Sequence, residues 1–231
     1  MCGRFEVLSL DAVADVVRVL EAASPANVMP DWPARLVCPD GEAANAVPGD
    51  AVDVVIADAC SALLIARLTW GFTVDWSPRP VYNTRLEKAM GPEPGMWAEP
   101  IAHGRCVVAA RGFFETHGSE KARSPKTGRQ IKRRYRFGDA DGAPLLLAAV
   151  CGDGCFSIVT TSPNAVVSPV HDRMPLVLNP QDAAWWLRAS WPEFASNWRK
   201  LADCGGVRLT SRPEQTAAVA IKSPYEQGVL F

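Results

Sequence analysis

No stretch of the sequence approaches the roughly 20 consecutive apolar residues that a membrane-spanning helix needs. The start of the chain also lacks the basic segment followed by an apolar run that marks a secretory signal. The first absence excludes a helical membrane protein, and the second argues against secretion. We therefore expect a cytoplasmic protein with no membrane partner.

A disulfide framework and a metal site are missing as well. The chain has seven cysteines, an odd number, and without a secretory signal they are expected to stay reduced. Cys151 and Cys155 stand four residues apart, but no nearby His or Cys offers the second pair of ligands of a structural zinc site. We expect neither a metal nor a cofactor.

Long helices do not alternate with the strands, which argues against a doubly wound parallel sheet. Most apolar runs are short, rich in Val, Ile and Leu and bounded by Gly, Pro, Asp or Ser, which predicts strands. The expected strands are Val52–Ile56, Ala62–Leu68, Cys106–Phe114, Leu145–Val150, Cys155–Thr160, Pro175–Leu178, Val207–Thr210 and Ala217–Ile221. We expect one α+β domain over residues 1–231, a strand-dominated, barrel-like β core with a few peripheral helices.

Helix starts are marked by capping residues. Ser9 precedes apolar residues at helical spacing, and Asn179-Pro180 opens a second helical segment. Ser190-Trp191-Pro192-Glu193 has the pattern of a capping box, and Ser162-Pro163 can start a short helix. We therefore expect helices after Ser9, Ser162, Asn179 and Ser190.

The most informative residue is Cys2, which follows Met1 directly. Removal of Met1 would leave Cys2 with a free α-amine beside its thiol, and such an aminothiol captures an aldehyde first as a Schiff base and then as a thiazolidine ring. The α-amine titrates at about pH 7.7–8.0, so part of it is neutral and nucleophilic at pH 7. A nearby cation or base activates the thiol. Position alone leaves open that Cys2 merely follows the initiator.

Positive charge is concentrated in one segment, although the net charge is only −1. Between Lys121 and Arg136 the sequence contains no acidic residue. Its cations are Lys121, Arg123, Lys126, Arg129, Lys132, Arg133, Arg134 and Arg136. Such a run is typical of a solvated hairpin, but it also suits the neutralisation of nucleic-acid phosphates.

Four segments place reactive side chains outside the periodic core pattern. They are Cys2-Gly3-Arg4-Phe5, Asn83-Thr84-Arg85-Leu86-Glu87, Gly112-Phe113-Phe114-Glu115 and His171-Asp172-Arg173-Met174-Pro175. In this order and spacing they resemble the SOS-response-associated peptidase (SRAP) family, also called the abasic-site-processing family. Further blocks extend the resemblance over most of the chain: Asn27-Val28-Met29-Pro30, Trp70-Gly71 with Trp76, and Arg105-Cys106.

The resemblance implies a covalent reaction with damaged DNA. Cys2 would crosslink to the ring-opened aldehyde of an abasic site in single-stranded DNA, and the crosslink would shield the lesion. Asn83 would orient Cys2 and the sugar, while Glu115 and His171 would move protons during Schiff-base formation, strand opening and reversal. Removal of Met1, by the protein or by a cellular aminopeptidase, is the peptidase activity of the family name. A bacterial cytoplasmic protein is implied.

The resemblance also implies a DNA-binding set. Arg4, Arg85 and Arg173 would grip the phosphates that flank the lesion. We expect Trp70, Trp76, Trp185 and Trp186 to pack in the core, although Trp70, beside Gly71, is also a candidate wedge against DNA. The expected partner is single-stranded DNA with abasic sites, bound by a monomer.

General chemistry agrees with these roles but leaves structural alternatives open. Loss of water from an amine–aldehyde adduct needs an acid that titrates near neutrality, which suits His171 and a partly buried Glu115. Arginine binds phosphate oxygens in a bidentate way. Equally, Glu115 could pair with a core arginine, His171 could be a hydrogen-bonding residue, and Asn83 could belong to a turn.

Two positions depart from the family pattern. Thr116, followed by His117, stands where the family has Trp after the glutamate, so a DNA contact of that Trp would be lost or replaced. Thr84 stands where Ala is usual.

Two other functions stay open. Glutamine amidotransferases with an N-terminal nucleophile also begin Met-Cys-Gly, but that class does not explain the other three segments. A non-catalytic single-strand binder, in which Cys2 is incidental, is the second alternative.

Overall fold

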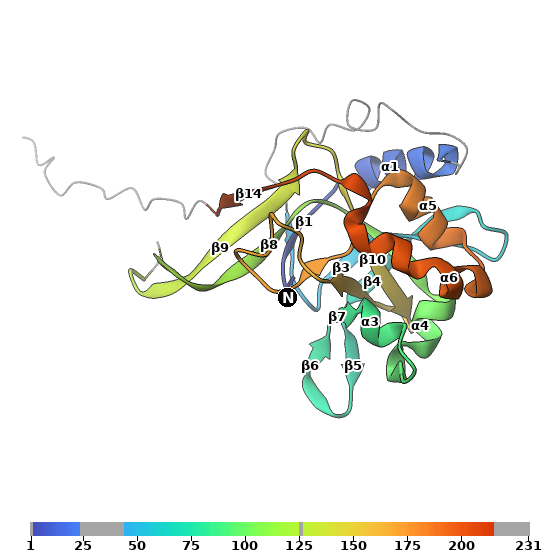
Figure 1. Ribbon diagram of the computed structural model, residues 1–231, viewed down its shortest axis with the longest axis horizontal. Coiled ribbons are helices and arrows are strands. Elements are labelled where there is room, and N and C mark those ends of the chain that lie inside the picture. Colours follow the sequence, from blue (N-terminus) through green and yellow to red (C-terminus); the bar gives the residue numbers. More distant parts are fainter. Residues whose placement is uncertain (1, 24–43, 125–126, 215–231) are drawn as a thin grey trace, which may run out of the picture.

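The computed structural model describes residues 2–23, 44–124 and 127–214, without the side chains of residues 202–205 (Figure 1). Met1, the Asn27–Pro30 block, Lys126 and the strand expected at Ala217–Ile221 lie outside the described residues.

A mixed, largely antiparallel sheet of twelve strands forms the centre of the described part of the chain, and a separate two-stranded hairpin accompanies it. The strands of the large sheet are β1 (Phe5–Val7), β2 (Asn45–Ala46), β3 (Ala51–Ala57), β4 (Leu63–Trp70), β7 (Asn83–Arg85), β8 (Arg105–Arg123), β9 (Gln130–Asp139), β10 (Leu145–Gly152), β11 (Cys155–Thr161), β12 (Met174–Pro175), β13 (Val177–Leu178) and β14 (Leu209–Pro213). The hairpin consists of β5 (Phe72–Val74) and β6 (Ser77–Val81).

Five of these strands close into a ring. β8 pairs with β10, β10 with β11, β11 with β4, β4 with β3, and β3 again with β8. All of these pairs are antiparallel except β11 with β4. β10 is buried over six successive residues, Leu145 to Val150, which is expected of a strand covered on both sides. The predicted strand-dominated α+β core is confirmed.

Helices lie around this ring (Figure 1). They are α1 (Leu10–Ala22), α3 (Leu86–Ala89), α4 (Ala98–His103), α5 (Pro180–Arg188) and α6 (Trp191–Asn197), with two 3₁₀ segments at Gly95–Trp97 and Trp198–Gly206. The predicted caps of α1 and α5 are confirmed, since Ser9 accepts a hydrogen bond from the Ala12 amide (3.3 Å) and Asn179 from the Asp182 amide (2.8 Å). In the described residues, no helix has the length and apolar character needed to cross a bilayer.

Two local predictions are wrong. The segment after Ser162 forms turns instead of a helix, because the Asn164 side chain accepts hydrogen bonds from the amides of Val166 and Val167. At the start of α6, the Ser190 side chain makes no capping hydrogen bond. Glu193 accepts instead from the indole N–H of Trp185 (2.6 Å), so the capping box does not form.

Candidate functional site

Cys2 lies in the interior, three residues before the first strand, β1. β1 runs antiparallel to β8, and the Phe114 amide continues the pairing by donating to the Arg4 carbonyl (2.9 Å). The side chain of Cys2 is completely buried, and its thiol donates weakly to the same Arg4 carbonyl (3.6 Å). Burial, and then the charge of Glu115, raises the pKa of this thiol well above its usual range. The thiol is therefore protonated at neutral pH in this environment.

Asn83 holds Cys2 in place from the opposite side. β7 pairs in parallel with β11, with Asn83 opposite Ile158, and the Asn83 side-chain amide donates to the Cys2 carbonyl (2.9 Å). This contact fixes the orientation of the amide, because a flipped group would set two oxygens against each other. Oδ1 of Asn83 is buried and has no hydrogen-bond partner among the described residues. A buried acceptor left in this state costs about 1–3 kcal/mol, so the site favours a ligand that donates a hydrogen bond here.

Glu115 lies in the middle of β8 and is 3% exposed. Burial raises the pKa of its carboxyl group from 4.5 to about 7, and the charge of Asp172 acts in the same direction. A carboxyl group that titrates near neutrality can both donate and accept a proton at physiological pH.

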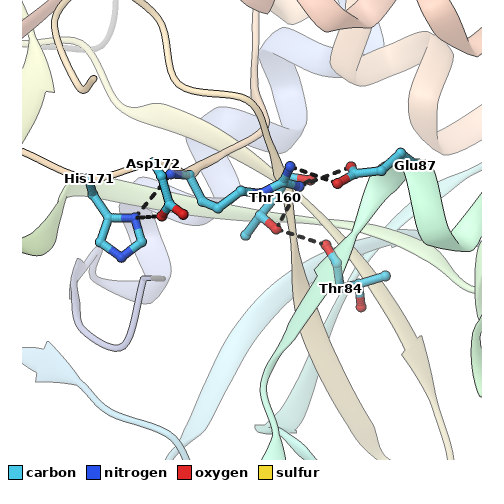
Figure 2. Close-up of polar contacts among 6 residues, drawn as sticks. Thr84, Glu87, Thr160, His171 and Asp172 are labelled. Atoms are coloured by element: carbon cyan, nitrogen blue, oxygen red, sulfur yellow. Dashed lines mark hydrogen bonds and ion pairs between the residues drawn. The ribbon is translucent and has the colours of Figure 1, made fainter. Parts of the chain in front are cut away.

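His171 faces this carboxyl group. Its Nε2 lies 3.9 Å from Oε2 of Glu115. Burial lowers the pKa of His171, although the neighbouring Asp172 opposes the shift. Nδ1 lies 3.0 Å from both the Arg173 amide and the Asp172 carboxylate (Figure 2). In the neutral ring, acceptance from the Arg173 amide leaves the proton on Nε2, directed toward Glu115.

The loop that carries His171 is fixed by an arginine clamp. Both terminal nitrogens of Arg173 bind the Glu87 carboxylate (2.7 and 3.0 Å), and one of them also donates to the Thr160 carbonyl (2.7 Å). Burial opposes ionisation of Glu87, but the hydrogen bonds and charge of Arg173 prevail and lower its pKa. Figure 2 shows Glu87 and Thr160 on neighbouring elements beside the loop of His171 and Asp172. Arg173 therefore positions the loop, and a phosphate would have to compete with Glu87 for it.

The other two expected phosphate ligands differ in availability. Arg4 forms an ion pair with Glu214, and its guanidinium lies 3.7 Å from the centre of the Phe114 ring. Arg85 is exposed and directly precedes α3, two residues after Asn83. Among the three arginines, Arg85 is the one with no ion pair to another described residue.

For Trp70 the structure confirms the expected core position over the alternative of a DNA wedge, and for Trp76 it corrects the expectation. Trp70 is completely buried, with its indole N–H donating to the Tyr82 carbonyl (2.9 Å) and its ring 4.7 Å from that of Phe5. It packs against Phe5 of β1 in the core and is not positioned as a surface wedge. Trp76, expected in the core, is 72% exposed at the turn between β5 and β6. Its setting between Asp75 and Ser77-Pro78 is typical of a turn, and this signal could have identified it as a surface residue.

Thr116, which stands where the resemblance leads us to expect Trp, is half-buried opposite Arg134 of β9. The next residue, His117, lies with its ring 6.0 Å from that of Tyr135. Its Nδ1 accepts hydrogen bonds from the amides of Ser119 and Glu120. His117 therefore fixes the backbone of β8 at Ser119 and Glu120, where β8 and β9 continue as a hairpin.

The site thus joins four segments that are distant in the sequence. Cys2, Asn83, Glu115 and His171 meet at one place through the contacts above, whereas Trp70 lies beneath it and Arg4 is held on the Phe114 side. In the part of the chain that the structure describes, no group of three or more His, Cys, Asp and Glu residues is arranged to hold a metal ion.

The chain is similar to known proteins from other organisms. The family model "SOS response associated peptidase (SRAP)" matches residues 1–215. The abasic site processing protein YedK of Escherichia coli is 29% identical over 153 residues, which are 62% of this chain and 64% of that protein. The abasic site processing protein YoqW of Bacillus subtilis is 23% identical over 206 residues, 81% of this chain and 80% of that one.

Solved structures agree with the fold. A phage-related protein from Bordetella bronchiseptica has a TM-score of 0.65 at 25% identity, over 93% of this chain and 95% of its own. A second protein from the same organism has a TM-score of 0.62 at 19% identity and covers 93% of this chain and all of its own.

Proposed function

Because the chain belongs to the SOS response associated peptidase family, whose curated members are abasic site processing proteins, we propose that it captures abasic sites covalently through Cys2. The observation that carries this proposal is the meeting of Cys2, Asn83, Glu115 and His171 in one site, in which Cys2 and Glu115 are buried. The substrate is the ring-opened aldehyde of an abasic site in single-stranded DNA.

The reaction begins after removal of Met1. The α-amine of Cys2 adds to the aldehyde carbon and forms a C–N bond. The resulting carbinolamine loses its hydroxyl group with a proton, as one water, and an imine forms. The thiol sulfur then adds to the imine carbon while its proton passes to nitrogen, which closes a thiazolidine ring. The high pKa of the buried thiol supports this order, with the amine reacting before the sulfur.

Glu115 and His171 supply the proton transfers. Expulsion of water from the carbinolamine needs an acid, and the Glu115 carboxyl with a pKa of about 7 is half protonated at that pH. His171, at 3.9 Å, exchanges protons with it. The same pair supports strand opening and reversal, the lyase-like reactions, and supplies a base for autocatalytic removal of Met1.

Asn83 and the arginines place the DNA. The vacant Oδ1 of Asn83 accepts a hydrogen bond from the incoming amine or a sugar hydroxyl. Arg85 binds a flanking phosphate directly. Arg4 and Arg173 bind phosphate only after they release Glu214 and Glu87, respectively.

Trapping on an abasic oligonucleotide tests the proposal. Mixing the protein with abasic single-stranded DNA, without a reductant, is expected to give an adduct that survives a denaturing gel. Cys2→Ala should abolish it, and Cys60→Ala, at an exposed thiol, should leave it intact. An equal adduct yield with Cys2→Ala would reduce the protein to a non-covalent DNA binder. Release of ammonia from glutamine, absent in Cys2→Ala, would instead support an amidotransferase.

A further inference from the structure

The β8–β9 hairpin extends beyond the rest of the sheet as a two-stranded arm. β1 accompanies β8 as far as Phe113, and β14 accompanies β9 as far as Tyr135. Beyond the pair Glu115–Tyr135, β8 and β9 are hydrogen-bonded only to each other among the described strands. Figure 1 shows the hairpin projecting away from the ring of strands. We call residues 118–123 and 129–134 the basic arm.

The basic arm carries positive charge that the described part of the protein does not neutralise. Arg133 pairs with Glu120 (3.4 Å), and Arg134 pairs with Glu214 (3.2 Å). Four other cations are exposed and form no ion pair with another described residue: Lys121, Arg123, Arg129 and Lys132. The chain as a whole has a net charge of −1, so this positive charge is local.

Three of these cations share one face of the ribbon. Lys121 lies directly opposite Lys132 in the antiparallel register, and Arg123 is two residues along the same strand from Lys121. Directly opposed side chains and side chains two residues apart point to the same face of a sheet. Like charges directly opposite each other destabilise a ribbon, and a solvated hairpin has no need of them. An anion bound between them would turn this repulsion into attraction.

We propose that the basic arm binds the phosphate backbone of the DNA that flanks the lesion. The inference rests on the proposed function and deepens it, since it extends the binding surface beyond Cys2. β9 extends from Tyr135, paired with Glu115 at the base of the arm, back to Gln130, which is five residues away and about 17 Å along the strand. For a strand stacked as in a duplex, with a rise of about 3.4 Å per nucleotide, that length corresponds to roughly five nucleotide steps. The arm therefore contacts only a strand that continues several nucleotides past the abasic site.

The test compares two lengths of DNA and two matched double variants. The long oligonucleotide has 20 nucleotides with a central abasic analogue that cannot react, and the short one keeps two nucleotides on each side. The arm variant Arg123→Gln/Lys132→Gln and the control Arg18→Gln/Arg199→Gln remove the same charge. Arg18 and Arg199 are exposed, on α1 and on the 3₁₀ segment after α6.

We expect the wild type and the control to bind the long strand more tightly than the short one. In the arm variant, the ratio of these two affinities should be about tenfold smaller. Loss of two phosphate contacts should lower the salt slope of long-strand binding by about 1.4, so that affinity falls about sevenfold less between 50 and 200 mM salt. Unchanged length preference and salt slope in the arm variant would overturn the inference, as would equal losses in the control. The proposed function fails separately, if the wild type forms no adduct with a reactive abasic strand of either length.

Discussion

The side-chain amide of Asn83 donates to the backbone carbonyl of Cys2 at 2.9 Å, across 81 positions of the sequence. This contact connects the segment before the first strand to β7 and holds Cys2 beside Glu115 and His171. In the proposed reaction Asn83 is a positioning residue for Cys2, and its Oδ1, which has no hydrogen-bond partner among the described residues, is a candidate ligand for the substrate.

Asn83→Ala should slow adduct formation by about five- to thirtyfold, since a hydrogen bond of this kind contributes about 1–2 kcal/mol to holding the reacting groups. The measurement is the single-turnover rate with an abasic oligonucleotide. Asn197→Ala, on α6, serves as the control for loss of an amide far from Cys2. An unchanged rate in Asn83→Ala would remove Asn83 from the site.

Glu115→Gln should change how stability depends on pH. The folded-state pKa of Glu115 is raised to about 7, so its protonated form is held more tightly in the folded chain than in the unfolded one. This contribution is full below pH 4.5 and is lost as the pH rises to about 7. From pH 5 to 8 the free energy of unfolding should fall by up to about 3 kcal/mol more in the wild type than in Glu115→Gln.

Urea unfolding at half-unit pH steps measures this difference. Glu99→Gln is the matched control, because the Glu99 side chain is 88% exposed. Parallel pH profiles for the wild type and Glu115→Gln would show that Glu115 titrates normally in the folded protein.

Arg173→Lys should loosen the loop of His171, because lysine cannot bind both oxygens of Glu87 at once. We expect slower adduct formation and a lower melting temperature, with little change in the salt dependence of DNA binding. Glu87→Gln, which keeps the shape of the partner, should show part of the same loss. Because lysine keeps the positive charge, the phosphate contact of Arg173 is measured with Arg173→Gln, in which a fall of about 0.7 in the salt slope would assign Arg173 to a phosphate as well.

Trp76→Ala should weaken binding of single-stranded DNA without affecting the fold. An exposed indole at the tip of the hairpin that leads to Asn83 is available to stack on a base, and such stacking contributes about 1–3 kcal/mol, or roughly 5- to 150-fold in affinity. Trp191→Ala, on α6, is the matched control for another partly exposed indole. Equal affinities of the two variants would leave Trp76 without a role in binding.

The sequence predicted most strands, and it singled out residues that the structure brings together, because both depend on local signals. Short apolar runs bounded by turn residues identified the ring strands, and motif spacing identified Cys2, Glu115 and His171. Contacts between distant segments were not predictable in this way. The pairing of Arg4 with Glu214 joins positions 210 residues apart, and no local pattern indicates it. The capping box at Ser190 failed for a related reason, since the Trp185 indole takes the Glu193 carboxylate.

The mass of the intact adduct tests the central claim most directly. If the amine of Cys2 condenses with the aldehyde, the product should weigh the sum of the oligonucleotide and the protein, less the Met1 residue and one water, and ring closure by the thiol leaves this mass unchanged. A variant that keeps one residue ahead of Cys2 should form no such product. A stable adduct that still contains Met1, or one that forms equally well with the blocked amine, would contradict the account.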